Sequence, residues 1–136
     1  MKALITGGAG FIGSHLADSL LARGDQVVLI DDLSTGRLSN IEHLNGRSDV
    51  EFVLGSILDA DLVDQVVSQV EVVFHLAAAV GVNLIVDRPL ESLMTNIRGT
   101  EIVVESAHKH SKRILVMSTS EIYGKNTSDS LAEDDD

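Results

Sequence analysis

Three glycines near the beginning of the chain have the spacing of a phosphate-binding turn. Gly7, Gly10 and Gly13 follow the apolar run 3–5, within the segment TGGAGFIGSHL at 6–16. Gly7 permits a tight turn after a strand, Gly10 lets backbone N–H groups approach a diphosphate, and Gly13 lets the next helix pack close to the sheet. The first N–H groups of such a helix have no partner within it and attract anions. These residues therefore predict a site for a phosphate group.

An acidic pair extends this prediction to a dinucleotide. Asp31 and Asp32 close a second apolar run, 27–30, eighteen residues after Gly13. A carboxylate at the end of a second strand accepts hydrogen bonds from the ribose hydroxyls of adenosine, and it repels a 2′-phosphate. Strand, glycine turn, helix, strand and acid together predict a dinucleotide-binding site. The alternative is a plain strand–helix–strand turn, because loops also collect glycines for conformational reasons.

Composition narrows the class of protein. The 136 residues are 44% hydrophobic, carry a net charge of −11 and include no cysteine. The excess of acids disfavours binding to nucleic acid and to anionic membranes, so we expect a small-molecule partner. Without cysteine there are no disulfides and no thiolate metal sites, and the histidines lack metal-ligand spacing, so we expect no metal. The first strand begins close to Met1, which leaves no room for a signal peptide, and we expect a cytoplasmic location.

Five apolar runs alternate with helical patterns, which is typical of a doubly wound α/β fold. The runs are continuous, as expected for strands that are buried on both faces of a parallel sheet. We expect a Rossmann-type sheet of three layers with strand order 3-2-1-4-5 and right-handed crossovers. The expected strands are 3–6, 26–30, 50–54, 71–76 and 113–117.

Three helices are expected between these strands. The first, 11–23, would place Phe11, Ile12, Leu16 and Leu20 on one stripe toward the core. The second, 59–69, would begin at Asp59 as its N-cap, and the third would run from Pro89 to about 109. The segment 31–49 reads as a loop with at most one helical turn near 41–44, and the acidic run 132–136 as a solvated tail.

The chain resembles the nucleotide-sugar branch of the extended short-chain dehydrogenase/reductase family. The resemblance covers the whole chain, and the matching segments occur in the family's order. Because family chains are longer, we expect 1–136 to be an incomplete NAD-binding Rossmann domain without its substrate-binding part. The segments are TGGAGFIGSHL (6–16), DLSTG (32–36), GSILD (55–59), HLAAA (75–79), NIRGT (96–100) and STSEIYG (118–124).

The resemblance implies a set of contacts with NAD. Asp31 stands at the family's position for the ribose ligand, which favours NAD over NADP, whereas Asp32 is expected mainly to cap the loop that wraps the adenosine. Ser56 replaces the family's usual Asp near adenine, and Asn96 would order the active site from the long helix. The full set of expected cofactor-binding residues is Gly7, Gly10, Phe11, Ile12, Gly13, Asp31, Asp32, Ser34, Thr35, Gly36, Ser56, Ile57, Leu76, Ala77, Ala78 and Asn96.

Catalytic groups are expected after the fifth strand. In the family a hydroxyl that matches Thr119 bonds the reacting sugar hydroxyl, and the residues that match Ser120 and Glu121 vary with the chemistry. The Ser-Glu form resembles sugar-nucleotide decarboxylases and some GDP-mannose dehydratases. The alternative for this segment is a hydroxyl-rich turn at a strand end. His75 closes an apolar strand and is expected to be a structural residue with satisfied hydrogen bonds.

The family's Tyr-x-x-x-Lys pair is missing from the chain. Tyr123 is the only tyrosine, Thr127 stands four residues later, and Lys125 is two residues away, where a helix cannot bring both groups to one face. The resemblance implies the NAD-binding part of an epimerase or decarboxylase that acts on a UDP-, GDP- or dTDP-sugar and is a homodimer at full length. The alternatives are a 4,6-dehydratase, a non-catalytic NAD-binding module, and a reductase of non-sugar substrates.

Overall fold

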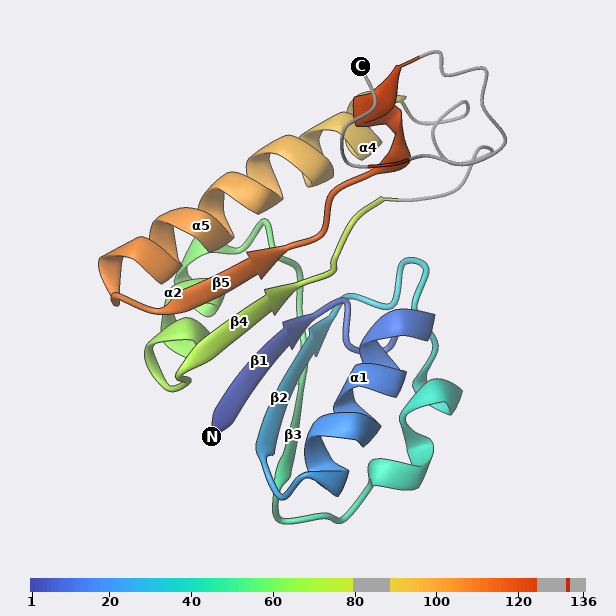
Figure 1. Cartoon of the computed structure of the whole chain (residues 1–136), viewed down its shortest axis with the longest axis vertical. Helices are drawn as coiled ribbons and strands as arrows, with labels where there is room; N and C mark the ends of the chain where they lie inside the picture. Colours follow the sequence, from blue (N-terminus) through green and yellow to red (C-terminus); the bar gives the residue numbers. More distant parts are fainter. Residues whose placement is uncertain (80–88, 125–131, 133–136) are drawn as a thin grey trace.

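A five-stranded parallel sheet forms the centre of the molecule. The computed structural model describes residues 1–79, 89–124 and 132. The strand order is β3-β2-β1-β4-β5, which confirms the predicted order (Figure 1). In the parallel register, Thr6 of β1 lies beside Ile30 of β2 and His75 of β4. The strands are β1 Lys2–Thr6, β2 Gln26–Asp31, β3 Val50–Leu54, β4 Val72–His75 and β5 Arg113–Val116.

Helices cover both faces of this sheet. On one face lie α1 (Phe11–Ala22) and two short 3₁₀ helices, η1 (Leu38–Asn40) and η2 (Glu42–Leu44). On the other face lie α2 (Ala60–Ser68) and α5 (Thr100–Lys109), which pack against each other. The chain enters α5 through α4 (Pro89–Met94) and a π-helical turn, η3 (Thr95–Gly99). A last 3₁₀ turn, η4 (Ser120–Tyr123), follows β5.

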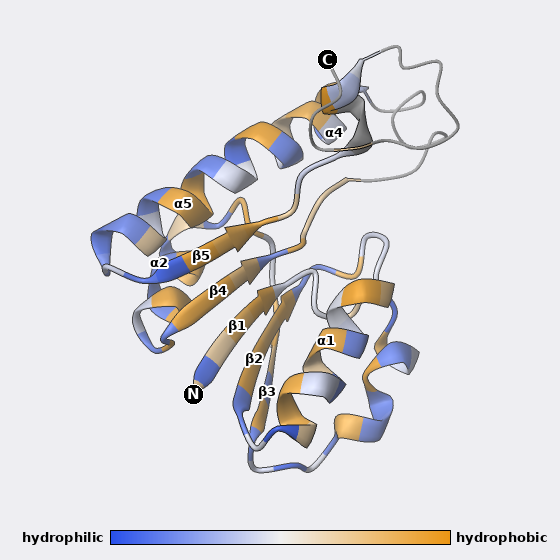
Figure 2. Cartoon of the chain, in the orientation of Figure 1, coloured by the Kyte–Doolittle hydropathy of each residue, from blue (hydrophilic) through white to orange (hydrophobic). Residues whose placement is uncertain are grey.

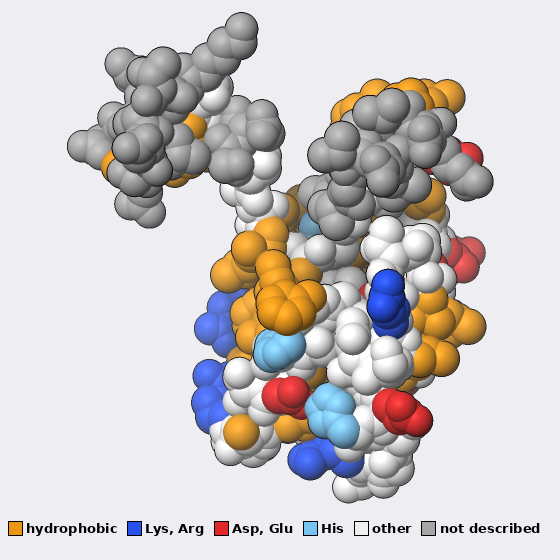
Figure 3. Space-filling view, turned by 90° about the vertical axis from the view of Figure 1, so that its right-hand side faces the viewer, with side chains coloured by type: hydrophobic (Ala, Val, Ile, Leu, Met, Phe, Trp, Pro, Cys, Tyr) orange, Lys and Arg blue, Asp and Glu red, His pale blue; other side chains and the backbone are white. Residues whose placement is uncertain are grey.

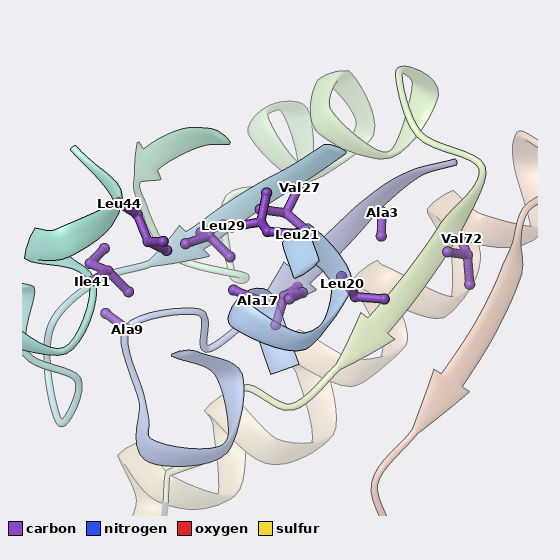
Figure 4. Packing of buried hydrophobic residues seen from close by; sticks show 11 residues of the cluster. Ala3, Ala9, Ala17, Leu20, Leu21, Val27, Leu29, Ile41, Leu44 and Val72 are labelled. Carbon is purple, nitrogen blue, oxygen red and sulfur yellow. The ribbon is translucent and has the colours of Figure 1, made fainter. Parts of the chain in front are cut away.

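The central strands supply the core to both faces. Ala3 and Ile5 of β1 point into the cluster under α1, whereas Leu4 points into the cluster under α2 and α5. Figure 2 shows the strands as largely apolar, and the residues of β1, β2 and β4 are mostly buried on both sides, as expected. The edge strands β3 and β5 are only partly buried, contrary to this expectation, because each has a neighbouring strand on one side alone. In the first cluster, Leu20 of α1 and Leu29 of β2 lie among the side chains drawn in Figure 4. The two faces are thus filled by alternate residues of the same strands.

The expected packing stripe of α1 is half right: Leu20 is buried and Leu16 packs against the core, but Phe11 and Ile12 do not. Phe11 and Ile12 are 77% and 57% exposed, although both were expected to face the core. Phe11 and Ile12 point away from the sheet-facing side of α1, and that side begins with small residues because Gly13 packs directly on Gly7 and Gly8. That face consists of Gly13, Ser14, Ala17, Leu20 and Leu21.

Two further expectations needed refinement. The segment expected to carry at most one helical turn carries two, η1 and η2. The long helix begins at Pro89 and ends at Lys109 as expected, but five of its residues form the π turn η3. Within the described residues, no helix is both long and apolar enough to cross a membrane.

Candidate functional site

The predicted site residues gather at the carboxyl edge of the sheet. The glycine turn follows β1, Asp31 ends β2, Ser56 follows β3, Leu76 follows β4 and Thr119 follows β5. Since all strands are parallel, their carboxyl ends meet at one edge. The crevice outside this edge is where open parallel sheets bind ligands.

Packing requires the glycines of the turn. Gly7 has φ of 70°, and a Cβ atom there would lie 3.0 Å from the backbone N and Cα of Ala77. A Cβ atom at Gly13 would overlap the carbonyl oxygen of Gly7 and lie 2.9 Å from Cα of Gly8. The turn therefore brings β1, α1 and the end of β4 into direct backbone contact.

The amino end of α1 is open to a ligand. Its N-cap is Gly10, which provides no side-chain hydrogen bond, and the first turn contains no acidic residue. The N–H groups of Phe11, Ile12 and Gly13 precede the first intrahelical hydrogen bond, which runs from the Ser14 N–H to the Gly10 carbonyl (3.1 Å). Uncapped N–H groups and the positive end of the helix dipole suit a diphosphate. Phe11 and Ile12, whose side chains are exposed, supply two of these backbone N–H groups.

Asp31 is buried and joins the glycine turn to the next loop. One carboxylate oxygen accepts the Ala9 N–H (2.9 Å), and the other accepts the Leu33 N–H (2.8 Å). A Cβ atom at Gly36 would lie 2.7 Å from one of these oxygens, so Gly36 packs directly on the carboxylate. Each oxygen retains a lone pair for a further donor. Asp31 is 8% exposed.

The loop after Asp31, expected to wrap the adenosine, is ordered by its own short contacts. Asp32 accepts the Ser34 N–H (2.9 Å), which confirms that Asp32 caps this loop. Ser34 and Thr35 are exposed, and Gly36 is half-buried beside Asp31. The loop thus offers hydroxyl groups next to the buried carboxylate.

After β3, the expected adenine contacts divide between backbone and side chain. The Ser56 hydroxyl accepts the Leu58 N–H (3.2 Å), and Asp59 caps α2 by accepting the Leu62 N–H (3.1 Å), as expected. Ile57 is 5% exposed and packs in the cluster under α5. Only the backbone of Ile57 is therefore available to a ligand. A Cβ atom at Gly99 would overlap Ile57, so this loop lies against the long helix.

His75 is a structural residue, as predicted. The Thr6 hydroxyl oxygen accepts the N–H groups of Leu76 (3.1 Å) and Ala77 (3.0 Å), so its proton is donated to Nδ1 of His75 (2.8 Å). Nε2 of His75 then donates to the Thr100 hydroxyl (2.9 Å). This assigns the neutral ring with its proton on Nε2. Burial lowers the pKa of His75 below its usual value of 6.5.

The far end of the site lies between β4 and β5. Ala77 is half-buried, and Ala78 is exposed. Asn96, in the π turn η3, accepts the Ala79 N–H (2.7 Å) and donates to the Ala79 carbonyl (3.3 Å). A polar residue on this helix thus has backbone partners beyond β4, as its partial burial requires.

The predicted catalytic segment follows β5. Thr119 is exposed, and its carbonyl accepts the Ile122 N–H (3.4 Å) at the start of η4, which contains Ser120 and Glu121. Tyr123 ends the same turn. Within residues 1–79 and 89–124, no group of three or more histidines and carboxylates is arranged to hold a metal ion.

The face formed by α1 and the η1–η2 loop carries charges of both signs rather than one continuous patch (Figure 3). Asp18 of α1 and Nε2 of His43 in η2 are 2.7 Å apart. This contact is exposed and links the loop to the helix.

The sequence analysis missed Asn40, whose side-chain amide donates to the Ala9 carbonyl (2.8 Å). Nothing in its sequence context distinguishes it from the other polar residues of the loop.

Curated relatives are enzymes of nucleotide-sugar metabolism. The chain is 43% identical over 135 residues to a UDP-N-acetyl-alpha-D-glucosaminuronate decarboxylase of Bacillus cytotoxicus, covering 99% of this chain and 41% of the relative. It is 42% identical over 127 residues to a UDP-glucose 4-epimerase of Mycolicibacterium smegmatis, covering 91% and 41%. The chain therefore spans about two fifths of the length of these relatives.

Solved structures share the fold described above. DesIV of Streptomyces venezuelae, a dTDP-glucose 4,6-dehydratase with NAD bound, matches with a TM-score of 0.91 and 33% identity, covering 100% of this chain and 45% of DesIV. WbmH of Bordetella bronchiseptica, in complex with NAD⁺, matches with a TM-score of 0.84 and 38% identity, covering 99% and 44%. The family model for GDP-mannose 4,6 dehydratase matches residues 4–136. The chain therefore belongs to this family, within the nucleotide-sugar epimerases and dehydratases.

Proposed function

We propose that the chain binds NAD and forms the NAD-binding part of an enzyme that modifies a nucleotide sugar. One observation carries the proposal: the uncapped amino end of α1 lies beside the buried Asp31 carboxylate, and the Ala9 N–H joins the two. The glycine turn is closed on the end of β4 and offers backbone rather than side chains to the crevice. This combination suits a diphosphate and an adjacent ribose.

The residues of the chain divide the binding between them. The N–H groups of Phe11, Ile12 and Gly13 would hold the diphosphate, and the remaining lone pairs of Asp31 would accept the ribose hydroxyls. The negative charge of Asp31 would also repel a 2′-phosphate, which favours NAD over NADP. Ser34, Thr35 and the backbone of Ile57 would flank the adenosine. When bound, NAD supplies a hydride acceptor for the oxidation of a sugar hydroxyl to a ketone.

Substrate chemistry is proposed for the end of β5. Thr119 would hydrogen-bond the reacting sugar hydroxyl, and Ser120 and Glu121 would distinguish decarboxylation or epimerisation from 4,6-dehydration. The substrate would be a UDP-, GDP- or dTDP-linked sugar, as the names of the relatives suggest. The chain carries no Tyr-x-x-x-Lys pair, so we propose that residues 1–136 alone bind NAD without turnover. The missing pair is also what favours the second candidate, a non-catalytic NAD-binding module.

Exposed apolar residues on the long helix support a homodimer of the longer protein. Leu90, Leu93 and Ile97 are 69%, 54% and 61% exposed, and their spacing places them on one stripe of α4 and η3. Such a stripe is typical of a helix that packs against another subunit.

We propose a cytoplasmic location for the enzyme.

Calorimetric titration of the 136-residue chain tests the binding proposal. Wild-type protein is expected to bind NAD more tightly than NADP. Asp31→Ala should weaken NAD binding by about 1–3 kcal/mol, because charged hydrogen bonds to the ribose are lost. Asp49→Ala is the matched control, since it removes the same charge at the opposite edge, where Asp49 pairs with Arg47 (2.7 Å).

The Asp31→Ala variant needs a check of its fold, because its carboxylate also holds two backbone N–H groups. The variant should unfold cooperatively on heating, with a midpoint above the temperature of the titration. Unchanged NAD affinity in a folded Asp31→Ala variant would refute the ribose assignment. A wild-type chain that binds neither nucleotide would refute the proposed function.

A further inference from the structure

The peptide group between Ala9 and Gly10 is fixed by more hydrogen bonds than a turn requires. Its carbonyl, on Ala9, accepts both the Arg37 N–H (3.0 Å) and the side-chain amide of Asn40 (2.8 Å). Its N–H, on Gly10, donates to the Gly7 carbonyl (3.0 Å). The preceding N–H, on Ala9, donates to Asp31. The chain is therefore held on both sides at the point where it enters α1.

Asn40 is itself held by the core. It ends η1, where its own N–H donates to the Arg37 carbonyl (3.0 Å). The next residue, Ile41, is 5% exposed and belongs to the cluster that contains Ala9 (Figure 4). Leu44 of η2, also 5% exposed, lies in the same cluster. The Asn40 amide thus reaches Ala9 from an anchored position and not from a free loop.

The orientation of this peptide determines where the next N–H groups point. Phe11, Ile12 and Gly13 follow Gly10 directly, and their N–H groups are the ones without intrahelical partners. Groups that are fixed before a ligand binds lose less conformational freedom on binding. We infer that Asn40 is a positioning residue for the diphosphate, because it fixes the Ala9–Gly10 peptide and so aims the N–H groups of the first turn of α1. This inference rests on the proposed dinucleotide site.

The expected ligand has two parts, a diphosphate and an adenosine, and Asn40 acts on the first. Asn40 is bonded to the glycine turn, where we place the diphosphate, whereas the adenosine is expected to lie against Asp31, the segment 32–36 and the loop after β3. A defect at position 40 should therefore weaken ligands that carry a diphosphate and leave adenosine binding unchanged. A general loss of structure would weaken both.

NMR titration of the 136-residue chain with ADP-ribose and with adenosine makes this test. Asn40→Ala should reduce ADP-ribose affinity about fivefold, the equivalent of one neutral hydrogen bond. Asn40→Asp, of the same size, should reduce it further, because a carboxylate would face the Ala9 carbonyl. Adenosine affinity should stay within about twofold in both variants. Asn45→Ala is the control, since Asn45 is exposed in the same loop and, within the described residues, its hydrogen bond to the Glu42 carbonyl (3.1 Å) comes from the backbone N–H.

Amide hydrogen exchange provides a readout that needs no ligand. Exchange at Gly10 should be about fivefold faster in Asn40→Ala, while exchange at the β1 amides of Leu4 and Ile5 stays unchanged. Equal losses for ADP-ribose and adenosine, or unchanged exchange at Gly10, would overturn the inference. Asn40→Ser keeps a donor in a smaller side chain. Its ADP-ribose affinity and its exchange rate at Gly10 should lie between those of the wild type and of Asn40→Ala. Loss of the native fold in both Asn40→Ala and Asn40→Ser would also overturn it, because Asn40 would then be a residue of the folding core.

The two proposals fail in different ways. A wild-type chain without affinity for ADP-ribose would refute the proposed function, and exchange at Gly10 would then decide the role of Asn40 in fixing the turn. Normal wild-type binding together with unaltered binding by Asn40→Ala would refute the inference alone.

Discussion

The two halves of the site edge differ in how completely the chain covers them. On the side of β1 and β2, strand residues such as Ile5 and Leu29 are fully buried, and the loop after β2 is bonded to the glycine turn. On the side of β4 and β5, Phe74 is only partly buried, and Leu115, its neighbour in the sheet, is 46% exposed. The half that we assign to adenosine is therefore built from contacts within the described residues. The half assigned to the reacting groups ends in the edge strand β5, which presents Leu115 and Val116 to solvent, and on the adenosine side the same is true only of Leu54 at the end of the other edge strand, β3.

Truncation of one leucine in each half tests this contrast most strongly. Leu29→Ala should lower the free energy of unfolding by about 2–5 kcal/mol, because Leu29 is fully buried between β2 and α1. Leu115→Ala should lower it by about 1 kcal/mol or less, since half of that side chain is already in water. Urea unfolding measures both values. Equal losses would show that β5 is as well packed as β2 and would remove the contrast.

A pair of glycine substitutions sharpens the contrast within the adenosine half. Gly13→Ala should lower the free energy of unfolding by about 1–3 kcal/mol, because its Cβ atom would overlap the Gly7 carbonyl oxygen. Gly10→Ala is the matched control: its Cβ atom would lie 3.1 Å from the same oxygen, and the expected loss is about 1 kcal/mol or less. Thermal or urea unfolding distinguishes the two. A stabilised Gly13→Ala variant would contradict the close approach of α1 to the turn.

His75 of β4 is bonded to Thr6 of β1 where the two halves meet, and it gives a pH test. Burial lowers its pKa below 6.5, so below that pH the unfolded chain takes up a proton that the folded chain does not. Above pH 6.5, protonation of His75 should not change the free energy of unfolding. It should fall as the pH drops from 6.5 toward the folded pKa, by at most about 1.4 kcal/mol per pH unit.

His75→Asn is the comparison for this test, because it keeps polar atoms near Thr6 and Thr100 but does not titrate. Between pH 7 and pH 5 its stability should change less than that of the wild type. Parallel pH profiles would show that His75 is not the residue responsible.

The architecture was predictable from patterns that depend on neighbouring residues. The strands and their order follow from apolar runs, glycine positions and the handedness of crossovers, which are local or general rules. The caps formed by Asp59 and Asp32, and the structural role of His75, could be inferred for the same reason. Each depends on residues whose types already favour one partner.

Features that depend on distant packing could not be predicted in this way. Phe11 and Ile12 have the character of core residues, but the close packing of Gly13 on Gly7 and Gly8 fixes which side of α1 faces the sheet, and Phe11 and Ile12 lie on other sides of the helix and remain exposed. The contact of Asn40 with Ala9 joins positions 31 residues apart. No local pattern marks such a contact, because the partner is a backbone carbonyl and leaves no trace in residue type.

The contact between Gly99 and Ile57 has a consequence for sequence change. A methyl group at position 99 would meet the end of the Ile57 side chain, so a larger residue there requires Ile57 to move or position 57 to become smaller. Asn96 lies less than one turn away on the same helix. The loop after β3, where we propose adenine to bind, and the long helix are therefore coupled through this contact, and a graft of either segment from a relative should bring the other with it.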